Sequence, residues 1–66
     1  MSDPERLHRI KYMIQQRKCV PIDDFLDELE ISKATFKRDL EYLRSRLNAS
    51  IVYDRFLGGY KFENPG

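Results

Sequence analysis

Cysteine is almost absent from this sequence of 66 residues: Cys19 is its only one, so no disulfide can form within the chain. No apolar run is longer than three residues, whereas a membrane-spanning helix needs about 20 predominantly apolar residues in succession. The opening stretch, MSDPERLHRI, lacks the apolar core of a signal peptide. We therefore expect a cytoplasmic protein of a reducing compartment, with no disulfide framework and no membrane partner.

Residues that typically carry catalysis or bind metals are also sparse. His8 and Cys19 are single residues eleven positions apart, a spacing that matches no zinc-binding pattern. No glycine-rich phosphate loop occurs in the sequence. The carboxylates Asp23 and Asp24 are adjacent, so in a helix they point to different faces and do not form an acid–base pair. These observations argue against an enzyme, and we expect no catalytic residues, no metal and no cofactor.

Charged residues, by contrast, make up 35% of the chain, and the two signs are segregated along it. Residues 1–18 carry a net charge of +3, residues 19–31 carry −5, and residues 32–47 carry +3 again. The total of +1 therefore conceals two basic segments, which either form an anion-binding face or are simply solvated surface. With 41% hydrophobic residues the chain can fold, and its length allows one small domain over residues 1–66.

Apolar spacing predicts three helices, at about residues 2–17, 22–29 and 33–47. The first begins either with a capping box of Ser2 and Glu5 or with Asp3-Pro4 as cap and first turn. Ser32 is a suitable N-cap for the third helix. The apolar stripes expected to face the core are Leu7, Ile10 and Ile14, then Ile22, Phe25, Leu26 and Leu29, and finally Phe36, Leu40, Leu43 and Leu47.

The outward side of the third helix is small and basic in its first half. At about 100° per residue, Ala34 and Arg38 point directly away from the apolar stripe, with Lys37 on one flank and Thr35 at the rim. A small residue beside long cations suits close approach to a nucleic-acid groove. Asp39 lies near the core edge of the helix instead, so we expect it to pair with a base or a capping group.

The final segment, IVYDRFLGGYKF at residues 51–62, predicts a β-hairpin because its ends are rich in β-branched and aromatic residues and Gly58-Gly59 permits a turn. Tyr53 and Tyr60 are expected to pack this hairpin against the third helix. Lys18-Cys19-Val20 has the length for a brief strand. The resulting order is typical of a winged helix-turn-helix, a mainly α fold of three helices with a small β-hairpin as wing.

The stretch ISKATFKRDLEYLR, residues 31–44, resembles the recognition-helix pattern of DeoR-type bacterial repressors. The matching positions are Ser32, Thr35, Phe36, Lys37, Arg38, Asp39, Leu40 and Leu43. RLHRIKYMI at residues 6–14 and IVYD with GGYKF at residues 51–62 are similar to the DNA-binding domain at the N-terminus of WYL-domain transcriptional regulators. The resemblance covers roughly residues 5–63.

This resemblance implies a bacterial transcription regulator whose third helix enters the major groove of double-stranded DNA. WYL-type regulators normally carry a larger C-terminal sensing region, so we interpret residues 1–66 as an excised N-terminal domain, with a free-standing small regulator as the alternative. Helix-turn-helix domains that read DNA mostly act as dimers on paired half-sites, so we expect a homodimer in the full-length protein.

The expected DNA contacts are divided between the third helix and the wing. Arg38 and Lys37 are expected to read bases or clamp phosphates, Arg55 to reach the minor groove or a phosphate, and Arg6 and Arg9 lie where flanking phosphates could be met. The predicted DNA-binding residues are Ser32, Lys33, Ala34, Thr35, Lys37, Arg38, Arg55 and Lys61. Two rival hypotheses fit the same residues: a winged-helix protein–protein interaction module that docks through its acidic second helix, and RNA binding.

Overall fold

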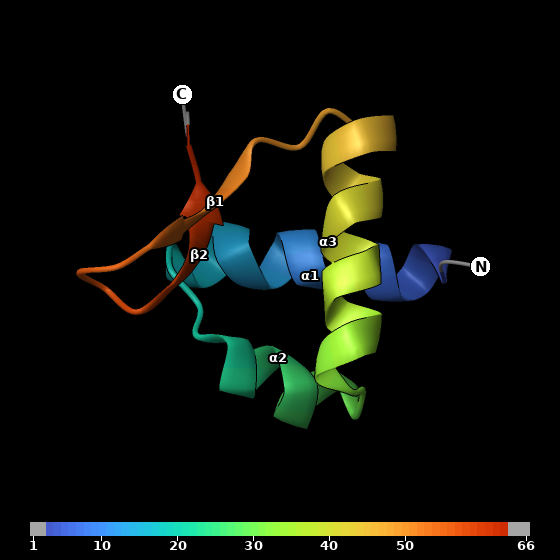
Figure 1. The fold of residues 1–66 in the computed structure, drawn as a ribbon, viewed down its shortest axis with the longest axis horizontal. Helices are drawn as coiled ribbons and strands as arrows, with labels where there is room; N and C mark the ends of the chain where they lie inside the picture. Colours follow the sequence, from blue (N-terminus) through green and yellow to red (C-terminus); the bar gives the residue numbers. More distant parts are fainter. Residues whose placement is uncertain (1–2, 64–66) are drawn as a thin grey trace.

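The computed structural model describes residues 3–63, which form three helices followed by an antiparallel hairpin (Figure 1). Helix α1 spans Pro4–Arg17, α2 spans Ile22–Leu29 and α3 spans Lys33–Arg46. Strands β1, Ile51–Asp54, and β2, Gly59–Phe62, pair in the register Ile51 to Phe62 through Asp54 to Gly59. The prediction of a mainly α winged helix-turn-helix fold is therefore confirmed.

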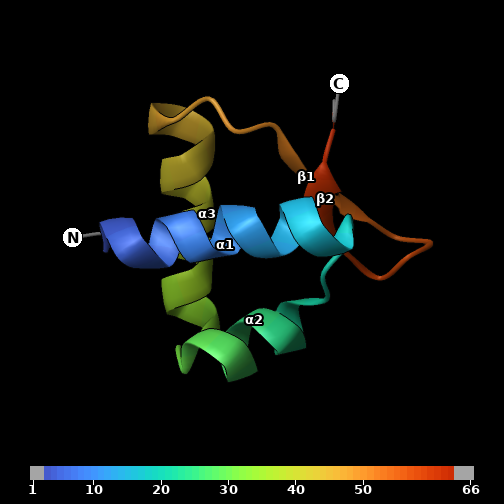
Figure 2. The same ribbon diagram turned by 180° about the vertical axis from the view of Figure 1, so that it is seen from behind.

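The helices cross one another, and the hairpin lies beside them. Helix α3 passes in front of α1 in Figure 1 and behind it in Figure 2, so the two helices are stacked with one face of α3 turned away from α1. Helix α2 lies near the N-terminal end of α3. The loop between β1 and β2 projects clear of the helices in both views.

Local sequence determines where each helix starts. The Asp3 carboxylate accepts hydrogen bonds from the backbone N–H groups of Glu5, at 3.0 Å, and Arg6, at 3.5 Å, so Asp3-Pro4 is the observed cap and first turn of α1. Ser2, the alternative cap, lies outside the described residues. Helix α2 begins directly after Pro21, with two acids in its first turn, where the helix dipole favours them.

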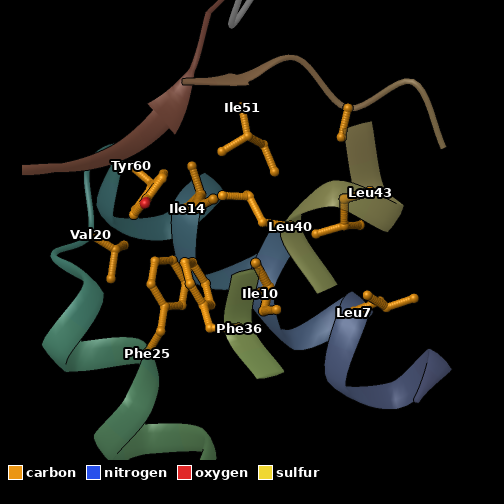
Figure 3. Packing of buried hydrophobic residues seen from close by; sticks show 11 residues of the cluster. Leu7, Ile10, Ile14, Val20, Phe25, Phe36, Leu40, Leu43, Ile51 and Tyr60 are labelled. Carbon is orange, nitrogen blue, oxygen red and sulfur yellow. The ribbon is translucent and has the colours of Figure 1, made fainter. Parts of the chain in front are cut away.

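The core fills the space between the three helices and the inner face of the hairpin (Figure 3). Burial matches the predicted stripes of α1 and α3 with one exception. Leu47 follows the last residue of α3 and keeps 47% of its surface exposed, so its predicted place in the stripe is wrong. The chain leaves the helix there, because Asn48 adopts a left-handed conformation with φ of 53°. The buried apolar residues are Leu7, Ile10, Ile14, Val20, Phe25, Phe36, Leu40, Leu43, Ala49, Ile51 and Tyr60.

Three aromatic rings join the helix-turn-helix to the wing. The rings of Phe25 in α2 and Phe36 in α3 stack with centroids 4.6 Å apart. Tyr60 of β2 packs edge-on to both, at 6.3 Å from Phe25 and 5.3 Å from Phe36. Tyr53 was also predicted to pack the hairpin against α3. Its ring packs edge-on to Tyr60, with centroids 5.3 Å apart, and Tyr53 is itself half exposed. Such aromatic pairs stabilise by about 0.5–1.5 kcal/mol each beyond the area that they bury.

The wing is also held by backbone pairing to the α1–α2 connection. Val20 and Tyr60 form an isolated antiparallel bridge, in which the N–H of each donates to the carbonyl of the other at 2.9 and 2.8 Å. The predicted brief strand at residues 18–20 is therefore reduced to one bridging residue. Gly59 makes this approach possible, because a Cβ at that position would lie 2.7 Å from the carbonyl carbon and oxygen of Val20.

An ion pair between the half-buried Arg6 and the buried Asp39 holds α1 against α3. Asp39 is only 1% exposed, and both of its carboxylate oxygens accept hydrogen bonds from Arg6, one from Nε and one from Nη2 at 3.2 Å. The hydrogen bond to Asp39 raises the pKa of the Arg6 guanidinium above its ordinary value. This confirms that Asp39 pairs with a base, and it means that Arg6 contacts Asp39 rather than presenting a free guanidinium to DNA.

Replacing Gly59 by Ala should destabilise the domain by about 3 kcal/mol, because the added methyl overlaps the Val20 backbone and breaks the bridge. Gly58→Ala is the matched control, because its Cβ would meet nothing within 4 Å and only the positive φ of 71° is strained. We expect that control to cost about 1 kcal/mol. Urea denaturation followed by circular dichroism measures both, and equal losses would mean that the close approach at Gly59 is unimportant.

Candidate nucleic-acid interface

The start of α3 is determined by the tight connection that precedes it. Glu30 adopts a left-handed conformation with φ of 53°, and the Ile31 N–H donates to the Leu26 carbonyl at 3.2 Å, which ends α2 and redirects the chain. The Ser32 hydroxyl oxygen then accepts from the Thr35 N–H at 3.2 Å, and its proton is directed to the Thr35 hydroxyl oxygen at 3.0 Å. The predicted N-cap is confirmed, and the Thr35 hydroxyl keeps its own proton for another acceptor.

The outward face of α3 is exposed and positively charged. Lys33, Ala34, Lys37 and Arg38 are all exposed, while Phe36 and Leu40 of the same helix are buried. Their exposure, opposite the buried Phe36 and Leu40, places them on the outward side of α3. The structure therefore brings together the predicted residues of the first half of α3 on one surface, which we call the α3 face: Ser32, Lys33, Ala34, Thr35, Lys37 and Arg38.

The cations of the α3 face carry uncompensated charge. The ion pairs found among residues 3–63 involve other bases: Arg6 with Asp39, Arg17 with Asp24, and Lys61 with Asp54. None of these ion pairs joins an acid of α2 to a cation of the α3 face, and Asp24 of α2 pairs with Arg17 of α1. A helix surface with a small residue at its centre and unpaired cations around it suits a polyanion.

Lys37 links the α3 face to the wing. Its ammonium lies 3.3 Å from the Tyr60 hydroxyl and 6.0 Å from the centroid of that ring. The Tyr60 ring is buried beneath it, so Lys37 leans from the helix toward β2. Helical periodicity predicted Lys37 at the flank of the outward face. It could not predict this hydrogen bond, because Lys37 and Tyr60 are 23 positions apart in the sequence.

The two wing residues predicted to contact DNA, Arg55 and Lys61, differ in exposure and in pairing. Arg55 is exposed in the turn between the strands, as expected for a residue at the tip. Lys61 is half buried, and its ammonium lies 2.8 Å from the Asp54 carboxylate. That carboxylate raises the pKa of Lys61, and the Lys61 ammonium is in turn the main cause that lowers the pKa of Asp54. Lys61 is therefore neutralised locally, unlike the cations of the α3 face.

Sequence reasoning missed the apolar tip of the wing. Phe56 is fully exposed and Leu57 is 64% exposed, and both follow Arg55 in the loop between β1 and β2. The signal available in the sequence was their position: two large apolar residues directly before Gly58-Gly59, in a turn that normally takes small polar residues.

Other surface features suggest no chemistry of their own. An open groove of about 700 Å³ lies between α1, the end of α3 and β2, and is lined by lysines and apolar side chains including Lys11, Lys18 and Phe62. Among residues 3–63, no group of three His, Cys, Asp or Glu side chains is placed to hold a metal ion. Within the same residues, no helix has the length and hydropathy needed to cross a membrane.

Comparison of the sequence with known protein families gives a match. A family model described as a DeoR-like helix-turn-helix domain matches residues 6–65, which is nearly the whole chain. Domains of this kind bind DNA in transcription regulation and are not catalytic. Searches of curated proteins and of solved structures found no match to the chain.

Asp54 organises the wing loop, so its replacement should loosen that loop. Its Oδ1 accepts from the N–H groups of Phe56 and Leu57 at 2.8 and 2.9 Å. Asp54→Ala removes this acceptor and should accelerate hydrogen exchange at both amides. Asp54→Asn is the control, because it keeps the acceptor and loses only the charge facing Lys61.

The same loop should respond to acid. The pKa of Asp54 is lowered from its ordinary value of 3.8, so its contribution to stability is fully present above that value and is lost as the pH falls through the lower, native pKa. We expect the NMR shifts of the Phe56 and Leu57 amides to titrate together, with a midpoint below 3.8. A midpoint at or above the ordinary value would contradict the hydrogen bonding described.

Proposed function

Because the chain belongs to the family of DeoR-like helix-turn-helix domains, we propose that it binds double-stranded DNA sequence-specifically as the DNA-binding part of a bacterial transcription regulator. The observation that carries this proposal is the α3 face, where Ala34 is surrounded by the exposed and unpaired cations Lys33, Lys37 and Arg38. A helix of this kind fits the major groove, which is wide enough to admit an α-helix.

Arg38 is the residue that we propose reads a base. It points directly away from the core, and its planar guanidinium can donate two parallel hydrogen bonds to O6 and N7 of a guanine. Ala34, one turn earlier on the same face, lets the helix backbone approach the base edges. Thr35 stands at the rim and keeps a hydroxyl proton for a phosphate oxygen, or it places its methyl against a thymine methyl.

The remaining contacts hold phosphates. Lys33 and the backbone N–H groups at the start of α3 lie at the positive end of the helix dipole, which favours a phosphate there. Lys37 reaches toward the wing and so suits the strand that borders the groove. Ser32 contributes mainly by capping α3. From the wing, Arg55 is proposed to contact the neighbouring groove, and Lys61 to approach phosphate only as part of its pair with Asp54.

A dimer on paired half-sites is proposed for the full regulator. Half-sites one helical turn apart are separated by about 34 Å, and the Cα atoms of one domain extend over 29 × 24 × 18 Å. Two domains therefore fit side by side on one face of DNA without overlap of their backbones. The similarity to WYL-domain regulators supports an N-terminal position for residues 1–66 in a longer cytoplasmic protein, with effector sensing located elsewhere.

Selection of duplexes from a randomised library, at low and at moderate salt, tests the proposed function. A sequence-reading domain should enrich a defined motif, and its affinity should fall steeply with salt because phosphate contacts release counterions. Salt-sensitive binding without enrichment would mean that only phosphates are contacted. If no duplex binds even at low salt, the exposed acids of α2, such as Asp23, Asp27 and Glu28, would favour a protein-interaction module instead.

Arg38→Ala should weaken binding to the enriched duplex by about 1–3 kcal/mol and relax the preference at one base position. Lys33→Ala is the matched control, because loss of a phosphate contact should weaken binding to all duplexes alike and reduce the salt slope by about 1. Fluorescence anisotropy on the enriched duplex and on single-position variants of it measures both effects. Unchanged binding and unchanged base preference in Arg38→Ala would refute the proposed reading of bases by this residue.

A further inference from the structure

The tip of the wing carries an apolar pair that the fold does not use. Phe56 has its full surface exposed, Leu57 is 64% exposed, and both lie in the loop that projects clear of the helices in Figures 1 and 2. Neither residue belongs to the hydrophobic core. Turns of this kind are normally built from Gly, Pro, Asn, Asp and Ser, so stability of the domain does not account for two large apolar side chains here.

The loop is nevertheless held in one conformation. The Asp54 carboxylate accepts from the N–H groups of both Phe56 and Leu57, and the Gly58 N–H donates to the Asp54 carbonyl at 2.8 Å. Lys61 holds the same carboxylate from the opposite strand. With its backbone polar groups bonded in this way, the loop presents the Phe56 and Leu57 side chains outward without a large ordering cost on binding.

We propose that Phe56, supported by Leu57, is a wedge that inserts between adjacent base pairs from the minor groove and partly unstacks them. This inference rests on the proposed DNA binding and adds a residue and a DNA deformation to it. Apolar side chains such as Phe and Leu act in this way in proteins that kink DNA through its minor groove. Arg55, the preceding residue, is exposed and pairs with none of the carboxylates of residues 3–63, so it supplies the positive charge that the minor groove attracts.

The size of the patch favours DNA over a protein partner. A stable protein interface buries at least about 1,000 Å² in total, and two side chains at the tip of a two-stranded hairpin are far too small for that. A wedge needs only one or two side chains at a base step. The tip is also narrow and flanked by charge, which suits a groove better than a flat protein surface.

The test uses the short duplex enriched in the selection, with 2-aminopurine placed in turn at successive positions on both sides of the motif. Binding of the unaltered domain should raise 2-aminopurine fluorescence at one step outside the α3 site. Phe56→Ala should abolish that increase and weaken binding roughly tenfold, the loss expected for one stacked aromatic. Phe56→Met retains an apolar side chain and should keep most of the signal.

Two controls separate this effect from others. Tyr12→Ala removes an aromatic that is exposed on α1, and it should change neither the fluorescence nor the affinity. Arg55→Ala should weaken binding while the increase at the same step persists, because it removes charge and leaves the wedge. Thermal denaturation should be the same for Phe56→Ala and the unaltered domain, because the Phe56 side chain is fully exposed.

The outcomes distinguish this inference from the function on which it rests. Binding of the enriched duplex with no fluorescence increase at any position would overturn the wedge and leave the proposed function intact. Unchanged DNA affinity of Phe56→Ala, together with loss of self-association in analytical ultracentrifugation, would overturn it in favour of a protein contact. Failure of the domain to bind any duplex would refute the proposed function itself, and the wedge with it.

Discussion

The position of Tyr60 is the constraint on which the rest of this small domain depends. Its backbone pairs with Val20 in the α1–α2 connection, and its ring packs edge-on to Phe25 and Phe36. Its hydroxyl accepts a hydrogen bond from the Lys37 ammonium. One residue therefore contacts every part of the fold that must be aligned for α3 and the wing to act together. The absence of a side chain at Gly59 is what allows β2 to come this close.

The charges of the domain are distributed by the same packing. Arg6, Arg17 and Lys61 each have a carboxylate partner, so they contribute to the structure locally. The cations of the α3 face have no such partner among the described residues, so their positive charge is exposed to solvent. A net charge of +1 is thus compatible with a strongly basic surface, because neutralisation occurs at defined places and not evenly over the molecule.

Much of this arrangement was predictable because it is local in sequence. The helix bounds, the Ser32 cap, the outward orientation of Arg38 and the partnered role of Asp39 all follow from periodicity and capping rules. The features that were missed are not specified by helix periodicity or capping. The Lys37–Tyr60 hydrogen bond, the neutralisation of Lys61 and the exposure of Leu47 each depend on the path of the chain after α3, which residue types do not determine.

The antiparallel bridge between Val20 and Tyr60 also has a consequence for the order in which the domain folds. Contacts of α2 with α3 join neighbouring segments, whereas the bridge closes a loop of about 40 residues and costs correspondingly more entropy to form. The helix-turn-helix should therefore assemble first and the wing dock last. Docking of the wing would then be the step that covers the stacked Phe25 and Phe36 rings with Tyr60. We therefore expect release of the wing to be the local opening that exposes these rings in the native domain.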